Sequence, residues 1–136
     1  MKQIKYHKVG LALFKDKKII MLRDDHQDTV FYFAGGGIEE GESDMDCLKR
    51  EIKEELDVEL NLNSVSFLGE FEAPAHVNPN ALVNIRLYTG QVISELKPSN
   101  EIVEIQYFDS STDPKNLTRI SREKIFPWLK KRGYIN

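Results

Sequence analysis

Residues 36–58 read GGIEEGESDMDCLKREIKEELDV, and this stretch decides the fold that the sequence predicts. Ser43 is a suitable helix N-cap, and Asp46, three residues later, suits the positive end of a helix. Apolar residues then recur at a spacing that places them on one helical face: Met45, Leu48, Ile52 and Leu56. The stretch therefore predicts an amphipathic helix that begins directly after Ser43.

Three glutamates lie beside the apolar face of this predicted helix. Because each helical residue turns about 100°, Glu51, Glu54 and Glu55 fall within a sector of roughly 100°. Carboxylates at this spacing repel each other by about 0.2–0.5 kcal/mol per pair. Mg²⁺ and Mn²⁺ prefer carboxylate oxygens and commonly bridge to phosphates, so a bound cation reverses this repulsion. The stripe indicates a metal site, and the ordinary alternative is a solvated helix face.

The spacing of the glycines, the arginine and the glutamates favours a metal site over a solvated helix face. Three glycines precede the helix, at positions 35 to 37, and glycine lets a backbone approach its neighbours closely. A glycine, an arginine and four glutamates then follow a fixed pattern: Gly36, Glu42, Arg50, Glu51, Glu54 and Glu55. At background frequencies of roughly 6–7% per residue type, a chance match in a chain this long is on the order of 10⁻⁵.

This segment resembles the Nudix box of MutT-like hydrolases. The box reads glycine, five residues, glutamate, seven residues, and then Arg-Glu-apolar-any-Glu-Glu-any-Gly-apolar. The match includes the six positions above together with Ile52 and Val58. The chain departs from the family at Asp57, where the box has a glycine that often needs a left-handed backbone, which Asp tolerates at modest cost. It also departs at Ala34, where many members have proline.

The resemblance implies a Nudix-like α/β/α sandwich of the α+β class, with a mixed β-sheet between helices, in one domain that spans residues 1–136. It implies Mg²⁺-dependent hydrolysis of a diphosphate linkage, in a nucleoside diphosphate derivative or a nucleoside triphosphate, with Mn²⁺ as a possible substitute. In this reaction a metal-activated water attacks phosphorus. The alternative is a nucleotide-sensing domain without activity, but such domains usually lose box glutamates, and all are present here.

The resemblance also implies roles for individual residues. Glu51, Glu54 and Glu55 are the expected metal ligands, and the further candidates are the carbonyl of Gly35 and the carboxylate of Glu101. We expect Glu54 to be the general base, although family members differ in where the base lies. Glu101 is a candidate for an extra ligand or base, but a solvated loop glutamate fits it equally well and Glu104 is its local rival. The family pattern further implies that Arg50 orients a neighbouring carboxylate, and that Glu42 supports the loop or helps to bind metal through water.

Outside the box, the sequence predicts mainly strands. Residues 9–14 and 19–22 suggest a hairpin around a charged turn. Residues 31–33 form a short aromatic strand that the glycines interrupt, and further strands are expected at 65–71, 82–92 and 102–108. Residues 121–132 suggest a closing helix, with a kink at Pro127. Strands around one central and one terminal helix favour a mixed sheet with helices packed on it.

Five residues are candidates for substrate binding. Asn84 and Arg86 lie on the polar side of the alternating strand 82–92, where they suit a phosphate or a base, although an ordinary solvent-facing strand fits them as well. Phe31 and Phe33, together with Tyr32 between them, are candidates for a stacking wall, although at least one of the three is expected in the core. The loops 24–29 and 73–81 are where we expect substrate recognition.

Composition restricts the remaining possibilities. The net charge of -3 gives no reason to expect nucleic-acid or membrane binding, so the expected partner is a small-molecule nucleotide or nucleoside diphosphate derivative. Cys47 is the chain's one cysteine, which excludes an internal disulfide, fits a reducing cytoplasm and suits a small packing residue. No long apolar run suggests a signal peptide or membrane span. A homodimer is expected because dimers are common in the family.

Overall fold

The computed structural model describes residues 3–25 and 30–136, so most of the predicted loop 24–29 lies outside the described residues. The described elements follow one another in this order: β1 (Lys5–Ala12), β2 (Phe14–Lys15), β3 (Lys18–Asp24), β4 (Ala34–Gly37), α1 (Asp44–Leu56), β5 (Leu60–Pro74), β6 (Leu82–Val92), β7 (Ile102–Phe108), a 3₁₀-helix (Pro114–Asn116), a π-helix (Ser121–Ile125) and α2 (Phe126–Lys131).

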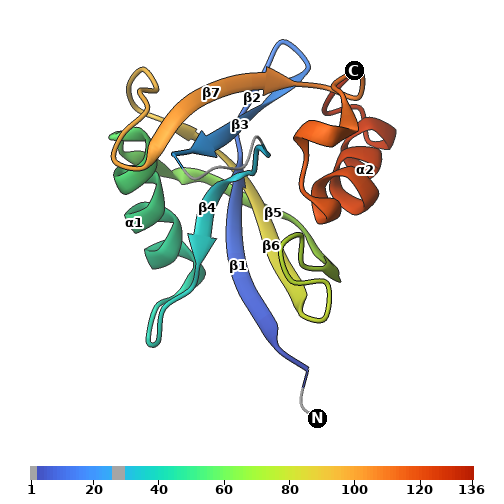
Figure 1. The fold of residues 1–136 in the computed structure, drawn as a ribbon. Coiled ribbons are helices and arrows are strands. Elements are labelled where there is room, and N and C mark those ends of the chain that lie inside the picture. The colour runs from blue at the N-terminus through green and yellow to red at the C-terminus, as the bar shows by residue number, and fades with distance from the viewer. Residues whose placement is uncertain (1–2, 26–29) are drawn as a thin grey trace.

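Within the described ranges the strands form two sheets that lie between α1 and α2 (Figure 1). The four-stranded sheet has the order β4-β1-β6-β5, and it is mixed because β1 runs parallel to β6 and antiparallel to β4. The three-stranded sheet has the order β2-β3-β7, in which β3 is antiparallel to both neighbours. This arrangement confirms the predicted α+β class with a mixed sheet between helices.

Both faces of the four-stranded sheet are buried. Val9 and Leu11 of β1 pack in one apolar cluster with Leu48 of α1. Leu87 of β6 packs in a second cluster with Leu129 of α2. Because successive side chains of a strand point to opposite faces, a single sheet can supply both clusters. One face of the sheet is therefore tied to the box helix, and the other face looks toward the C-terminal helix.

Helix α1 begins and ends where the sequence predicts. The Asp46 N–H donates to Ser43 Oγ at 3.1 Å, and the Ser43 N–H donates to Asp46 Oδ2 at 3.3 Å, which is a complete capping box. At the other end Asp57 adopts a left-handed conformation with φ 51°, and its N–H donates to the Lys53 carbonyl. The backbone of the family's glycine position is thus retained with aspartate in its place.

The predicted hairpin of residues 9–14 and 19–22 is wrong for most of its first strand, residues 9–12. Only β2 pairs with the start of β3, through a two-residue turn in which Asp16 and Lys17 have φ of 54° and 61°. Strand β1 pairs instead with β4 and β6 in the other sheet. These pairings join residues far apart in the sequence, and spacing within a short window cannot reveal them.

The glycine run is a strand and not an interruption. Gly35 and Gly36 in β4 pair with Gly10 and Val9 of β1. Gly35 has φ 119°, and a Cβ there would lie 2.1 Å from the Val9 carbonyl oxygen, so only glycine permits this approach. The predicted aromatic strand before it consists of isolated bridges, from Phe31 to Leu117 and from Tyr32 to Leu22.

The C-terminal helical segment changes its form before Pro127. Residues Ser121–Ile125 form a π-helical turn, and the Phe126 N–H donates to the Ser121 carbonyl. Pro127 has no N–H to continue a regular hydrogen-bond ladder, so the expected irregularity is present as a widened turn. None of the described helices has the length and the apolar character needed to span a membrane.

Candidate active site

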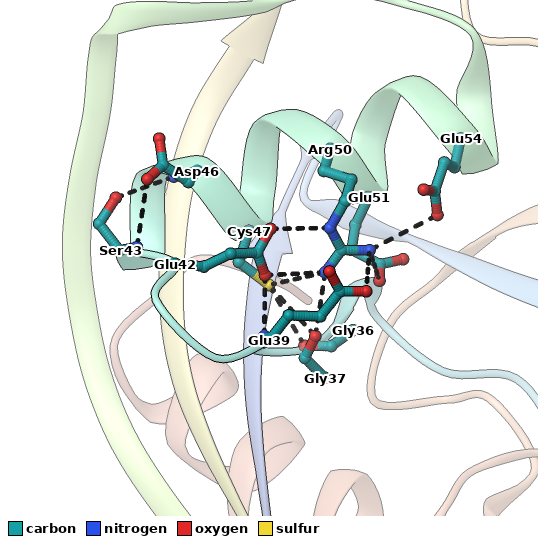
Figure 2. A network of polar contacts seen from close by, with 10 residues as sticks. All are labelled: Gly36, Gly37, Glu39, Glu42, Ser43, Asp46, Cys47, Arg50, Glu51 and Glu54. Atoms are coloured by element: carbon teal, nitrogen blue, oxygen red, sulfur yellow. Dashed lines mark hydrogen bonds and ion pairs between the residues drawn. The ribbon is translucent and has the colours of Figure 1, made fainter.

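Glu51 lies against the backbone of strand β4. A Cβ placed on Gly36 would come within 2.6 Å of Glu51 Cδ and 2.7 Å of Glu51 Oε1. The absence of a side chain at Gly36 therefore creates the space in which this carboxylate sits. Figure 2 shows both residues at the point where α1 passes the glycine strand. The box glycine and the first box glutamate of the helix, fifteen residues apart in number, act as one structural unit.

Arg50 is the centre of the polar network around this point (Figure 2). Its Nε and Nη2 donate to the two carboxylate oxygens of Glu42 at 2.8 and 2.9 Å, and Nη1 donates to Glu51 Oε1 at 2.7 Å. Nη2 also donates to the Gly37 carbonyl at 3.1 Å. Hydrogen bonds from Arg50, and then from the Glu39 N–H, lower the pKa of Glu42 to about 2. Arg50 thus orients Glu51 and ties the loop to the helix.

Glu54 and Glu55 differ sharply in their surroundings. Glu54 is exposed, and its Oε2 lies 3.6 Å from Arg50 Nη1. Glu55 is buried and accepts a 2.8 Å hydrogen bond from the Gly35 N–H. Burial raises the pKa of Glu55 to about 8; the Gly35 hydrogen bond opposes this rise, and the charges of Glu51 and Glu54 add to it. The carboxylates are therefore close enough to repel each other.

These side chains fit a hard divalent cation. They offer only carboxylate oxygens, which Mg²⁺ and Mn²⁺ prefer, and a cation would offset both the burial that chiefly raises the pKa of Glu55 and the repulsion from Glu51 and Glu54 that adds to it. In the part of the chain that is described, no three His, Cys, Asp or Glu side chains form a ready-made cage. Mg²⁺ typically takes one or two carboxylates and completes its shell with water and substrate phosphates.

A cavity of about 650 Å³ lies on the other face of the four-stranded sheet, bordered by the same glycines. Tyr6, Lys8 and Gly10 line it from β1, and Gly35 and Gly36 line it from β4. The remaining walls come from the aromatic segment, the β5–β6 loop and the segment before the π-helix: Val30, Tyr32, Phe33, Ala75, His76, Val77, Asn78, Thr118 and Ile120, among others. The glycine strand, at the edge of the sheet, thus lies between the carboxylates and a pocket of nucleotide size.

Tyr32 marks the place where further carboxylates approach the cavity. Its hydroxyl donates to Asp24 Oδ2 at 3.1 Å. The pKa of Tyr32 is raised strongly, first by burial, then by the charges of Asp24 and Glu55, and with a smaller contribution from Glu101. The loop that carries Glu101 is tied to the end of α1, because Asn100 Nδ2 donates to the Glu54 carbonyl at 2.6 Å. The structure therefore brings Glu101 near the box carboxylates.

The other four predicted substrate-binding residues separate into different places. Phe33 lines the cavity, whereas Phe31 is buried against Phe108 with ring centroids 4.9 Å apart. Arg86 and Asn84 are not among the lining residues. Arg86 donates to both carboxylate oxygens of Asp44 at 2.8 and 2.6 Å.

Asn84 is buried and donates through Nδ2 to Glu70 Oε2 at 2.8 Å. These contacts give Arg86 and Asn84 structural partners on the α1 side of the sheet, away from the cavity.

Sequence reasoning missed several residues of the cavity wall. Lys8, Tyr6 and His76 line it. The alternation of β1 carried a signal for Lys8: Tyr6, Lys8 and Gly10 share one face of the strand, and the apolar residues Val9 and Leu11 lie on the other. Reading that face as a wall requires the long-range pairing of β1, which the sequence did not reveal.

Comparisons with known proteins agree with this geometry. A model of the NUDIX domain matches residues 6–129. A MutT protein from Methanosarcina mazei Go1 is 16% identical with a TM-score of 0.77, and the match covers 97% of both chains. A UDP-X diphosphatase is 19% identical with a TM-score of 0.70, covering 98% of this chain and 66% of that one.

An ADP-ribose pyrophosphatase from Streptococcus suis 89-1591 is 18% identical with a TM-score of 0.55, covering 88% of this chain and 83% of that one. A search of curated protein sequences finds no match. At these identities the solved structures establish the fold, whereas the match to the domain model extends over most of the chain.

Proposed function

The chain belongs to the Nudix family of pyrophosphohydrolases, and on this premise we propose that it hydrolyses the diphosphate linkage of a nucleoside diphosphate derivative or a nucleoside triphosphate with the help of Mg²⁺. The observation that carries the proposal is the position of Glu51. Its carboxylate occupies the space that Gly36 leaves open, on a strand that also borders a cavity of nucleotide size.

Glu51, Glu54 and Glu55 would hold the metal, with Gly35 and Glu101 as additional candidates. When bound, Mg²⁺, or Mn²⁺ in its place, supplies neutralisation of the diphosphate and lowers the pKa of a coordinated water. Arg50 positions Glu51 through its 2.7 Å hydrogen bond and thereby supports this site. Glu55 is held by the Gly35 N–H, so its carboxylate is already oriented toward the glycine strand.

Glu54 is our choice for the general base. It is the exposed member of the three glutamates, with 52% of its side chain accessible, and among the described residues only Arg50, at 3.6 Å, pairs with its carboxylate. A side chain that reaches water and is free to rotate suits the removal of a proton from an attacking water molecule. Glu101 is the second candidate. Its charge adds a small contribution to the raised pKa of Tyr32, which lines the cavity, and its loop is anchored to α1 by the hydrogen bond from the Ser99 N–H to the Glu55 carbonyl.

The proposed substrate class is supported by the compounds for which two structural neighbours are named. The neighbours described above include a UDP-X diphosphatase and an ADP-ribose pyrophosphatase, which are named for different compounds. What these compounds share is a diphosphate between a nucleoside and a second group, and their names support this class beside nucleoside triphosphates for the present chain. The competing function, nucleotide sensing without hydrolysis, is disfavoured because the box glutamates are all present.

Hydrolysis of a nucleotide panel with Mg²⁺ tests the proposal, with Glu54→Gln as the informative variant. We expect divalent-dependent release of product by the wild type and a loss of about 10²–10⁴-fold in kcat for the variant, the usual contribution of a general base. Glu59→Gln, at an exposed position just beyond the helix, is the matched control and should retain activity.

Three results would count against the proposal or its parts. Hydrolysis that needs no divalent ion would refute the metal-dependent reaction. Full activity in Glu54→Gln would refute the choice of base and move the role to Glu101. Binding of nucleotides without turnover of any of them would favour the sensing function.

A further inference from the structure

Lys8 is a cation at the cavity wall with no partner in the described structure. It lies on β1, lines the cavity and is exposed, and it makes no ion pair or side-chain hydrogen bond with any described residue. An exposed lysine on a strand is usually explained by solvation. Lys8, however, lines a mostly apolar cavity. In ligand pockets of this kind the few polar or charged side chains typically bind and orient the ligand.

The other basic residues nearby are already engaged. Arg50 is surrounded by Glu42 and Glu51, and Arg86 is held by Asp44. Lys5, on the same strand, is paired with Glu72 at 3.0 Å. Within the described lining of the cavity, Lys8 is the only lysine or arginine. A phosphate that enters the cavity therefore meets one lysine or arginine side chain among the described lining residues, which also include His76.

The position of Lys8 along β1 places it between two different ends of the cavity. On one side it pairs in register with Gly37, next to the glycines that contact the box carboxylates, of which Gly35 donates to Glu55 at 2.8 Å. On the other side lies Tyr6, two residues away on the same strand face and 45% exposed. Val77, which is 88% exposed, also lines the cavity.

These two ends suit the two parts of a nucleotide. Tyr6 and Val77 are apolar or aromatic surfaces open at the cavity, and such surfaces pack against the faces of a planar ring. A strand advances about 3.3 Å per residue, so Lys8 lies roughly 7 Å from the Tyr6 position, toward the carboxylates. A base stacked at Tyr6 would thus direct its phosphates past Lys8 to the box glutamates.

The acidic residues around the cavity disfavour a substrate with additional negatively charged phosphates. Asp24 lines the cavity and accepts a hydrogen bond from the Tyr32 hydroxyl at 3.1 Å, and the Glu55 carboxylate is bonded to Gly35, another lining residue, at 2.8 Å. A nucleoside triphosphate has a terminal phosphate that adds further negative charge to this acidic surrounding, and the described lining offers no second lysine or arginine to meet it. A diphosphate esterified at both ends places no such group there.

We propose that Lys8 binds the substrate's diphosphate, and that a lining with this one lysine makes the site selective for a diphosphate joining a nucleoside to an uncharged group over a nucleoside triphosphate. The proposal rests on the proposed function for its reaction, but the binding role of Lys8 does not depend on turnover. It assigns a substrate-binding role to one residue and narrows the substrate class.

The first test is equilibrium binding of α,β-methylene-ADP-ribose, an ADP-ribose analogue whose diphosphate cannot be hydrolysed, measured by calorimetry with Mg²⁺ present. Because a hydrogen bond to a charged group contributes about 1.5–3 kcal/mol, we expect Lys8→Met to raise the Kd roughly tenfold or more. Lys8→Arg should restore most of the affinity. Lys5→Met is the matched control, because Lys5 lies on the same strand but is engaged with Glu72, and its Kd should equal that of the wild type.

The second test is steady-state kinetics on ADP-ribose, UDP-glucose, ATP and UTP. We expect kcat/KM of the wild type to be higher for the two diphosphate compounds than for the triphosphates by about tenfold or more, and Lys8→Met to raise KM with little change in kcat.

An unchanged Kd in Lys8→Met would overturn the binding role, whether or not the protein turns over any compound. A preference for triphosphates would overturn the selectivity while leaving the hydrolase function intact. If no compound is hydrolysed but Lys8→Met still weakens binding, the failure lies with the proposed function alone.

Discussion

At the scale of single residues, Gly36 and Glu51 show how a motif position acquires its meaning. The sequence identifies Gly36 as a fixed point of the box, but the structure supplies the reason: the Glu51 carboxylate rests where a Cβ would be. Gly36 does not have a positive φ, so backbone strain does not explain this glycine. Its function is to leave room.

Substituting Gly36 with alanine should therefore damage activity more than stability. The atoms that a Cβ would meet belong to the end of a flexible side chain, so the fold can adjust by moving the Glu51 carboxylate. Misplacing a functional group by about 1 Å can cost on the order of 100-fold in rate, and we expect such a loss in kcat/KM. Thermal unfolding should show a free energy of unfolding that changes by about 1 kcal/mol or less.

Gly37→Ala is the matched control, because nothing lies within 4 Å of a Cβ at that position. It should retain both activity and stability. Equal activity in the two variants would mean that the position of Glu51 does not matter for the reaction.

At the scale of elements, the attachment of α1 to the sheet depends on a polar contact near the start of the helix. Asp44, the first residue of α1, accepts two hydrogen bonds from Arg86 and one from the Tyr88 hydroxyl at 2.6 Å. Hydrogen bonding with Arg86 lowers the pKa of Asp44 despite its partial burial. A bidentate arginine–carboxylate pair fixes geometry as well as supplying energy.

Arg86→Met tests whether this contact is structural or whether Arg86 binds substrate, as the strand alternation suggested. We expect the free energy of unfolding to fall by about 2–3 kcal/mol, because Asp44 is left partly buried without its charged partner. KM should change by no more than about twofold, since a residue outside the cavity makes no ground-state contact with the substrate. Chemical denaturation and steady-state kinetics measure the two effects.

Arg119→Met serves as the control, because it breaks an exposed pair with Glu123 one helical turn away and should change stability by less than about 0.5 kcal/mol. A large rise in KM for Arg86→Met with unchanged stability would restore Arg86 as a substrate ligand.

The sequence predicts those elements whose causes are local. Helix α1 is an example, because the side chains of Ser43 and Asp46 cap it and its apolar spacing repeats within the helix. Strand β6 is another, with bounds that match residues 82–92. The sequence misplaces β1, because its partners β4 and β6 lie far along the chain and nothing within residues 9–14 identifies them. Sheet pairing is decided by the whole fold.

At the scale of the whole molecule, the site is formed by elements that lie far apart in the sequence and are brought together by the fold. The box helix lies on one face of the four-stranded sheet and the cavity on the other, and the glycine strand at the sheet's edge joins them. The sequence predicts the carboxylates because they share one helix. It does not predict Lys8 as part of the cavity, because that wall exists only after β1 enters the sheet beside β4.

The central claim is that the α1 carboxylates bind a divalent cation, and a titration with Mn²⁺ followed by electron paramagnetic resonance tests it most directly. The account predicts saturable binding to the wild type, a loss of affinity of at least about tenfold in Glu51→Gln and in Glu54→Gln, and wild-type affinity in Glu59→Gln. Absence of Mn²⁺ binding to the wild type, or equal affinity in all of these proteins, would contradict it.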